Sequence, residues 1–237
     1  MTAVIDAPVT TGPDLRRASR VLAAVLLPIG PVAVAILRFV LPYTTADSSE
    51  DVVRSVTAHQ TAQNAVVWLG FVACLTLVPA VIFAGRVVGR RSPRLAATAT
   101  VLLVLGYISL AWLNVGDAVM LYGVRHDLSA ALLADMYSGI HPAQTVAEGL
   151  FVAGHVLGTI LLGIGMLRGR VVAPVFAWAT IVAQPIHFVA AVILGSHALD
   201  LVGWGLNAVG FAALAIAILR LPDDEWAPAP WPARVQR

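Results

Sequence analysis

Seven strongly polar residues lie within or beside apolar stretches of this sequence, where such side chains are costly and are often functional. They are Asn114, Asp117, Glu148, His155, Gln184, His187 and Asn207. Glu148 and His155 are seven residues apart and Gln184 and His187 are three apart, so each pair shares one face of a helix. If these faces meet, the seven side chains line one small polar pocket.

Two kinds of cofactor site fit this set of residues. His155 and His187, with a carboxylate from Glu148 or Asp117, have the ligand types of a divalent zinc or iron site. The pair His155 and His187 also suits a b-type haem, because Gly154 beside His155 lets a macrocycle approach. No HExxH or HxxEH spacing is present. Either cofactor, and a membrane oxidoreductase built on it, therefore depends on proximity in the fold.

Transport and packing are the two other interpretations. A chain of Glu148, His155 and His187 can relay protons or bind a cation in a small-solute or proton-coupled transporter. Polar residues in membrane helices also commonly hydrogen-bond a neighbouring helix, for under about 2 kcal/mol each. Gly154 and Gly158 form a GxxxG pattern, which predicts helix packing and a helix-mediated oligomer. No GxSxG motif is present, so the sequence does not favour an enzyme.

The composition points to lipid as the solvent of this chain. Of 237 residues, 59% are hydrophobic and only 12% are charged, and the mean hydropathy is +0.86. A soluble domain carries about 25% charged residues. This excludes a disordered chain, a disulfide scaffold and a soluble nucleic-acid binder, and Cys74 is the single cysteine. The expected partner is the lipid bilayer.

Six apolar stretches are long enough to cross a bilayer, which needs about 20 residues per helix. Their approximate ranges are 21–42, 64–85, 95–117, 146–167, 172–194 and 201–219. The sequence therefore predicts an all-α, polytopic transmembrane bundle of six helices over residues 20–219. Residues 1–19 and 220–237 form an N-terminal and a Pro/Trp-rich C-terminal tail. The polar pocket then lies between helices three to six and opens outward.

The arginines predict the orientation, because cytoplasmic loops are enriched in positive charge. All fifteen cations are arginines. With the N-terminus inside, the cytoplasmic side receives Arg16, Arg17, Arg20, Arg86, Arg90, Arg91, Arg94, Arg168, Arg170, Arg220, Arg234 and Arg237. The outer side receives Arg38, Arg54 and Arg125. Both termini are thus predicted to be cytoplasmic, and the Ala, Val, Arg and Gly bias suits a bacterial inner (plasma) membrane.

The two long outer loops and the tail carry weaker patterns. Val52, Val53 and Val56 predict a short amphipathic helix lying against the membrane in residues 43–63. In residues 118–145, Leu128, Ala131, Leu132 and Tyr137 predict the apolar face of a second such helix, ending near Gly139. Four prolines after Leu221 predict an extended tail. Its Trp226 and Trp231 are expected at the headgroup layer.

The order of these features resembles a family of bacterial six-helix membrane proteins known as a domain of unknown function. The resemblance rests on the arginine-led first helix, the segment His141–Gln144 and the small-residue string 154–167 that precedes an arginine turn and Pro174. It covers residues 20–219. It implies the six-helix fold and supplies no catalytic residues.

Overall fold

The computed structural model describes residues 14–139 and 141–226, and every regular element in them is helical. Within these described residues, six helices are long and apolar enough to cross a membrane. They are α1 (Arg16–Val40), α3 (Gln60–Gly89), α4 (Pro93–Arg125), α6 (Pro142–Arg168), α7 (Pro174–Phe188) with its π-helical extension η1 (Val189–Leu194), and α8 (His197–Leu219). The predicted all-α, multi-pass bundle of six helices is confirmed.

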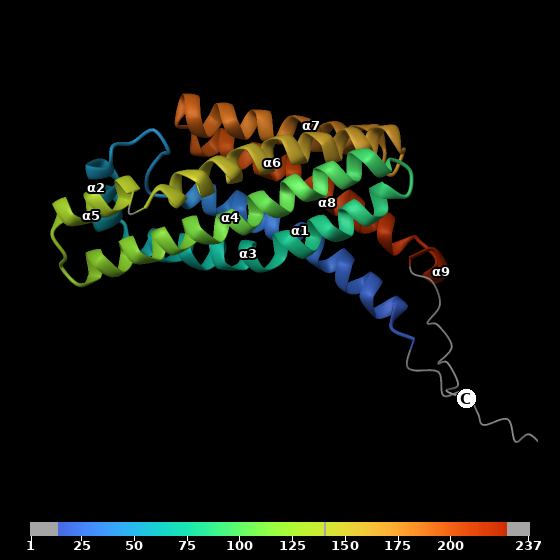
Figure 1. The fold of residues 1–237 in the computed structure, drawn as a ribbon, viewed down its shortest axis with the longest axis horizontal. Helices are drawn as coiled ribbons and strands as arrows, with labels where there is room; N and C mark the ends of the chain where they lie inside the picture. The colour runs from blue at the N-terminus through green and yellow to red at the C-terminus, as the bar shows by residue number, and fades with distance from the viewer. Residues whose placement is uncertain (1–13, 140, 227–237) are drawn as a thin grey trace, which may run out of the picture.

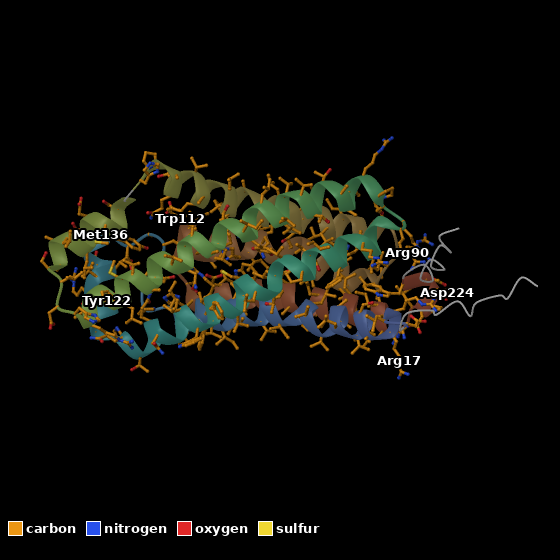
Figure 2. The ribbon with its side chains drawn as sticks, turned by 60° about the horizontal axis from the view of Figure 1, so that its bottom comes forward. Arg17, Arg90, Trp112, Tyr122, Met136 and Asp224 are labelled. Carbon is orange, nitrogen blue, oxygen red and sulfur yellow. The ribbon has the colours of Figure 1, made fainter. Side chains whose placement is uncertain are left out.

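The six long helices lie side by side, and three short helices lie at the ends of the bundle (Figure 1). We call the end that carries α2 (Ser49–Ala58) and α5 (Ala130–Gly139) the cap end. The end that carries Arg16 and α9 (Asp223–Trp226) is the terminal end. Arg17 and Arg90 lie at the terminal end (Figure 2). The two described ends of the chain therefore share one side of the bundle.

The glycines of the GxxxG pattern bring α6 against α4. A Cβ added to Gly154 would lie 2.5 Å from the carbonyl oxygen of Leu102 and 2.9 Å from the Cα of Gly106. A Cβ added to Gly158 would lie 2.6 Å from Leu103. Only glycine permits so close an approach of two backbones. The pattern is therefore a packing face within the chain, rather than a surface left free for a second copy.

At the cap end, the two predicted amphipathic helices pack against each other instead of lying on lipid. Val52, Val53 and Val56 are buried in one cluster with Leu133 and Ala134 of α5. Of the predicted apolar face of the second helix, Tyr137 packs against this cluster, and Leu128 and Leu132 are 41% and 47% exposed. Its end at Gly139 agrees with the sequence, since Gly139 has a φ of +141°.

At the terminal end, the start of the tail folds back on the bundle. The expectation of an extended segment is wrong for residues 223–226, which form one helical turn. Trp226 is only 3% exposed, its Nε1 donates to Ser19 Oγ at 2.9 Å, and Arg86 lies 4.7 Å from its ring centroid. It therefore packs on the protein rather than at a headgroup layer. Trp231, Arg234, Arg237 and residues 1–13 lie outside the described residues.

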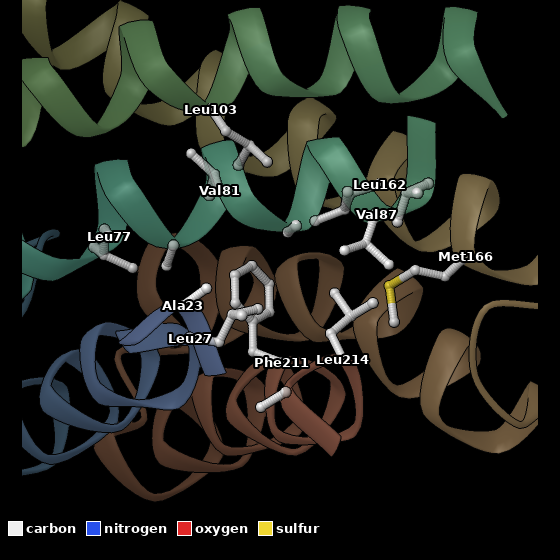
Figure 3. Packing of buried hydrophobic residues seen from close by; sticks show 14 of the residues in the cluster. Ala23, Leu27, Leu77, Val81, Val87, Leu103, Leu162, Met166, Phe211 and Leu214 are labelled. Carbon is white, nitrogen blue, oxygen red and sulfur yellow. The ribbon is translucent and has the colours of Figure 1, made fainter. Parts of the chain in front are cut away.

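Between the middle of the bundle and the terminal end, the interior is mainly apolar, and Thr180 of α7 is a buried polar side chain within it. Side chains from α4, α6 and α8 fill it, among them Leu103, Leu162, Phe211 and Leu214 (Figure 3). Each of these four is 0% exposed. Dispersion contacts between close-packed side chains hold helices together inside a bilayer, where burial from water contributes little.

Candidate functional site

A charged cluster of three residues lies near the cap end of the bundle, with one residue from each of α1, α7 and α8. Arg38 Nε donates to Asp200 Oδ2 at 2.5 Å, and His187 Nδ1 lies 2.5 Å from Asp200 Oδ1. Asp200 is 1% exposed, and the side chains of Arg38 and His187 are 14% and 11% exposed. A buried carboxylate is stable only when it is paired in this way, so removing either partner leaves an uncompensated charge.

The local sequence explains why the carboxylate lies here. Ser196 caps α8 by accepting from the backbone N–H of Leu199, so the helix starts at His197. Asp200 therefore occupies the first helical turn, where the partial positive charge of the helix N-terminus stabilises an anion. His197 Nδ1 lies 3.0 Å from the carbonyl oxygen of Arg38 and joins the end of α1 to the same turn.

Sequence reasoning missed two of the three members of this cluster. The predicted sixth span began at residue 201, which left Asp200 in a loop, and Arg38 was counted only toward orientation. One signal was present: Asp200, Gly203, Asn207 and Gly210 recur at spacings of three, four and three, as on one face of a helix. Starting the helix one turn earlier would have placed Asp200 on that face.

Next to the charged cluster, two histidines and a tryptophan pack together in the interior. The ring centroids of His155 and His187 are 5.3 Å apart, and Trp204 lies 5.9 Å from the first and 5.5 Å from the second. His155 Nδ1 lies 2.5 Å from the carbonyl oxygen of Phe151 and so must carry a hydrogen. Its Nε2 is buried and has no hydrogen-bond partner among the described residues. The structure thus brings His155 and His187 together, which the sequence left as a condition of the pocket.

Gln184 and Asn207 are both 0% exposed and lie one helical turn from this aromatic group, on the side away from the charged cluster. The side-chain nitrogen and oxygen of each have no hydrogen-bond partner in the described part of the chain. Four of the seven predicted pocket residues therefore lie in one continuous polar region of the interior.

Asn114 and Asp117 belong to a different polar group, formed by α3, α4 and the loop before α2. Tyr43 Oη donates to Asp117 Oδ1 at 2.5 Å and Gln63 Nε2 donates to the same oxygen at 2.8 Å. Burial, and then the nearby Asp117 carboxylate, raise the pKa of the Tyr43 phenol well above its usual value. Asn114 packs over Gly70, where its Oδ1 occupies the space of a Cβ. This group holds the cap end together.

Glu148 does not reach either polar group. It is exposed on the first turns of α6, and Gln144 Nε2 donates to its Oε1 at 3.1 Å. The carboxylate beside the histidine pair is therefore that of Asp200, whereas the sequence had suggested Glu148 or Asp117.

A metal or haem finds little support in this geometry. Among residues 14–139 and 141–226, no three His, Cys, Asp or Glu side chains gather in a way that suits a metal ion. The His155 and His187 rings both pack against Trp204, which leaves no slot for a macrocycle between them. His187 also uses Nδ1 on Asp200.

A change of helix type adjoins the site. After Phe188, α7 continues as the π-helix Val189–Leu194 and ends at Gly195, which has a φ of +60°. Thr45 Oγ1 donates to the carbonyl oxygen of Ala191 at 2.5 Å, which ties the loop after α1 to this segment. π-Helical turns are rare and occur often beside functional residues. Here the π-helix begins two residues after His187.

The chain was compared with family models, with curated proteins and with solved structures, and none of them matches. The roles of these residues therefore follow from geometry and chemistry alone.

Proposed function

We propose that this chain is a proton-coupled carrier of a bacterial plasma membrane, in which His187 binds the coupling proton. The observation that carries the proposal is the buried Asp200, shared between Arg38 and His187 inside a bundle of membrane-spanning helices. Ionisable groups at such depth are costly and typically mark proton or substrate pathways.

The hydrogen bonds determine which atom takes the proton. An ionised carboxylate only accepts, so His187 Nδ1 must donate to Asp200, and Nε2 is the ring nitrogen that can take a further proton. The charges of Arg38 and Asp200 cancel, and a proton on Nε2 then makes the cluster positive. Asp200 favours the imidazolium, whereas the nearby Arg38 opposes it.

A second histidine ring lies beside His187. His155 presents an unpartnered, buried Nε2, and its ring centroid is 5.3 Å from that of His187. The titratable and charged groups that face His187 are thus Arg38 from α1, His155 from α6 and Asp200 from α8. Proton entry is from the cap end, since the interior toward the terminal end is mainly apolar.

The arginines support the orientation of the carrier. Those near the terminal end include Arg86, Arg90 and Arg91, and Arg17 lies there too (Figure 2). Because cytoplasmic loops attract positive charge, we assign the terminal end, with both termini, to the cytoplasm. The charged cluster then lies at the depth of the outer leaflet of the membrane.

Charge movement after a pH step tests the proposal. Proteoliposomes on a solid-supported membrane, taken from about pH 8 to pH 5, should give a transient current as protons bind the site. His187→Gln should abolish the current, whereas Glu148→Gln, an exposed carboxylate on α6, should retain it. No current from the unaltered protein, or an equal current from His187→Gln, would overturn the proposal.

A further inference from the structure

A groove of about 940 Å³ lies between α2 and α5, the two short helices that lie side by side at the cap end (Figure 1). One face of each helix lines this cap groove, because the lining residues recur one and four positions apart along the chain. Small-molecule sites in proteins have volumes of about 300–1,000 Å³. The cap groove is therefore large enough for a ligand of that class.

Short side chains keep the cap groove open. The two helices touch through the buried cluster at the cap end, and Val53 and Ala134 of that cluster form the base of the groove. Above this base, the groove is lined by Ala58 of α2 and by Ala130 and Ala131 of α5, all exposed. A methyl group is too short to fill the space between two helices. The floor of the groove is thus apolar and accessible to water.

Most polar groups along the walls can only accept hydrogen bonds. Thr57 Oγ1 donates to the carbonyl oxygen of Val53 at 2.7 Å, and Ser138 Oγ donates to that of Asp135 at 2.7 Å. A hydroxyl has one hydrogen, so each of these oxygens is left as an acceptor toward the groove. Glu50 and Asp135 add a carboxylate from each helix, and neither forms a salt bridge with any residue that the structure describes.

The cation in the lining is already engaged. Arg54 of α2 lines the groove and forms a salt bridge with Asp51, three residues before it on the same helix. The charges of this pair cancel, so Glu50 and Asp135 leave the cap groove negative. Its charge and its acceptors both call for a ligand that is positive and donates hydrogen bonds.

From this geometry we infer that the cap groove binds an organic cation, an ammonium group carried on an apolar body. An ammonium group has only donors, which complements walls that offer acceptors. The apolar body covers the alanine floor. Glu50 and Asp135 repel an anion of the same shape. The inference goes beyond the proposed function, because the groove shares no residue with the cluster of Arg38, His187 and Asp200.

Benzylamine and benzoate, which have similar size and opposite charge at neutral pH, make the test direct. Saturation-transfer NMR titrations on the full chain, in nanodiscs of phosphatidylcholine, give the Kd of each. Benzylamine should bind above the signal of empty nanodiscs, and benzoate should not. No binding of benzylamine beyond empty nanodiscs, or equal binding of benzoate, would overturn the inference.

Neutral variants of the two carboxylates locate the site. Glu50→Gln and Asp135→Asn should each raise the Kd of benzylamine about threefold, and the double variant about tenfold, because single exposed ion pairs are weak. The matched control is Asp127→Asn, an exposed carboxylate at the cap end that does not line the groove. Asp127 has a φ of +53°, a conformation that asparagine also adopts, so this variant should keep the Kd of the unaltered protein. A Kd unchanged by the double variant, or raised equally by Asp127→Asn, would refute the site.

Filling the groove separates binding inside it from attraction to a negative surface. Ala131→Leu keeps every charge and occupies part of the floor, so it should also raise the Kd of benzylamine about threefold or more. An unchanged Kd in Ala131→Leu would overturn the groove as the site. Glu50, Asp127, Ala131 and Asp135 are all exposed, so the Tm of each variant should equal that of the unaltered protein. A raised Kd at an unchanged Tm thus reports the loss of the site and not of the fold.

Discussion

The two halves of the bundle differ in the residues that fill their interiors. Toward the cap end, Arg38, His187 and Asp200 are buried with charges that must be paired. Toward the terminal end, the interior contains residues such as Leu162 and Phe211. An apolar interior would have sufficed throughout, because a buried ion pair rarely adds stability over packed apolar residues. The polar half is therefore the half to which the proposed function assigns a role.

The largest expected effect comes from breaking the charged cluster on one side only. Asp200→Ala leaves Arg38 and its charge buried without a partner, and we expect a loss of about 3–5 kcal/mol in the free energy of unfolding. The double variant Arg38→Met, Asp200→Leu removes both charges and should recover most of that loss. Unfolding in a denaturing detergent measures both.

If the double variant were as unstable as Asp200→Ala, the cluster would be needed for stability. The contrast between a functional half and a packed half would then fail.

A somewhat smaller effect is expected from the apolar half. Phe211→Ala removes a ring that is 0% exposed and leaves a cavity, for about 3 kcal/mol. Phe71→Ala on α3 is the matched control, since Phe71 is 49% exposed on the outer surface of the bundle and its loss leaves no cavity. The same unfolding assay compares the two, and the pH-step current of Phe211→Ala should persist wherever the variant is folded. Equal losses for the two phenylalanines would contradict the tight packing of this half.

The sequence predicts the architecture well because length and missing charge are sufficient to identify a membrane helix. The site is harder to predict, because burial depends on which faces meet. His155, Gln184, His187 and Asn207 lie where their helix faces meet a neighbouring helix, whereas Glu148, on the same face of α6 as His155, lies two turns earlier, where that face is exposed.

Helix boundaries account for another error. Asp200 belongs to the site because α8 begins at His197, one turn before the apolar run, where Ser196 caps the helix. A search for apolar runs does not detect a first helical turn that is polar. Trp226 was placed wrongly for a different reason: its contacts with Ser19 and Arg86 join segments that are far apart in the sequence.

The protonation of His187 is the most direct test of the central claim, and ¹⁵N NMR of the labelled imidazole measures it. The hydrogen bond to Asp200 predicts a hydrogen on Nδ1 at every pH, and the proposed proton coupling requires Nε2 to gain a proton on acidification. Asp200→Asn removes the ionised acceptor that favours the imidazolium, so Nε2 should gain its proton less readily in this variant. A hydrogen on Nε2 at every pH, or a ring that never gains its second proton, would contradict the account.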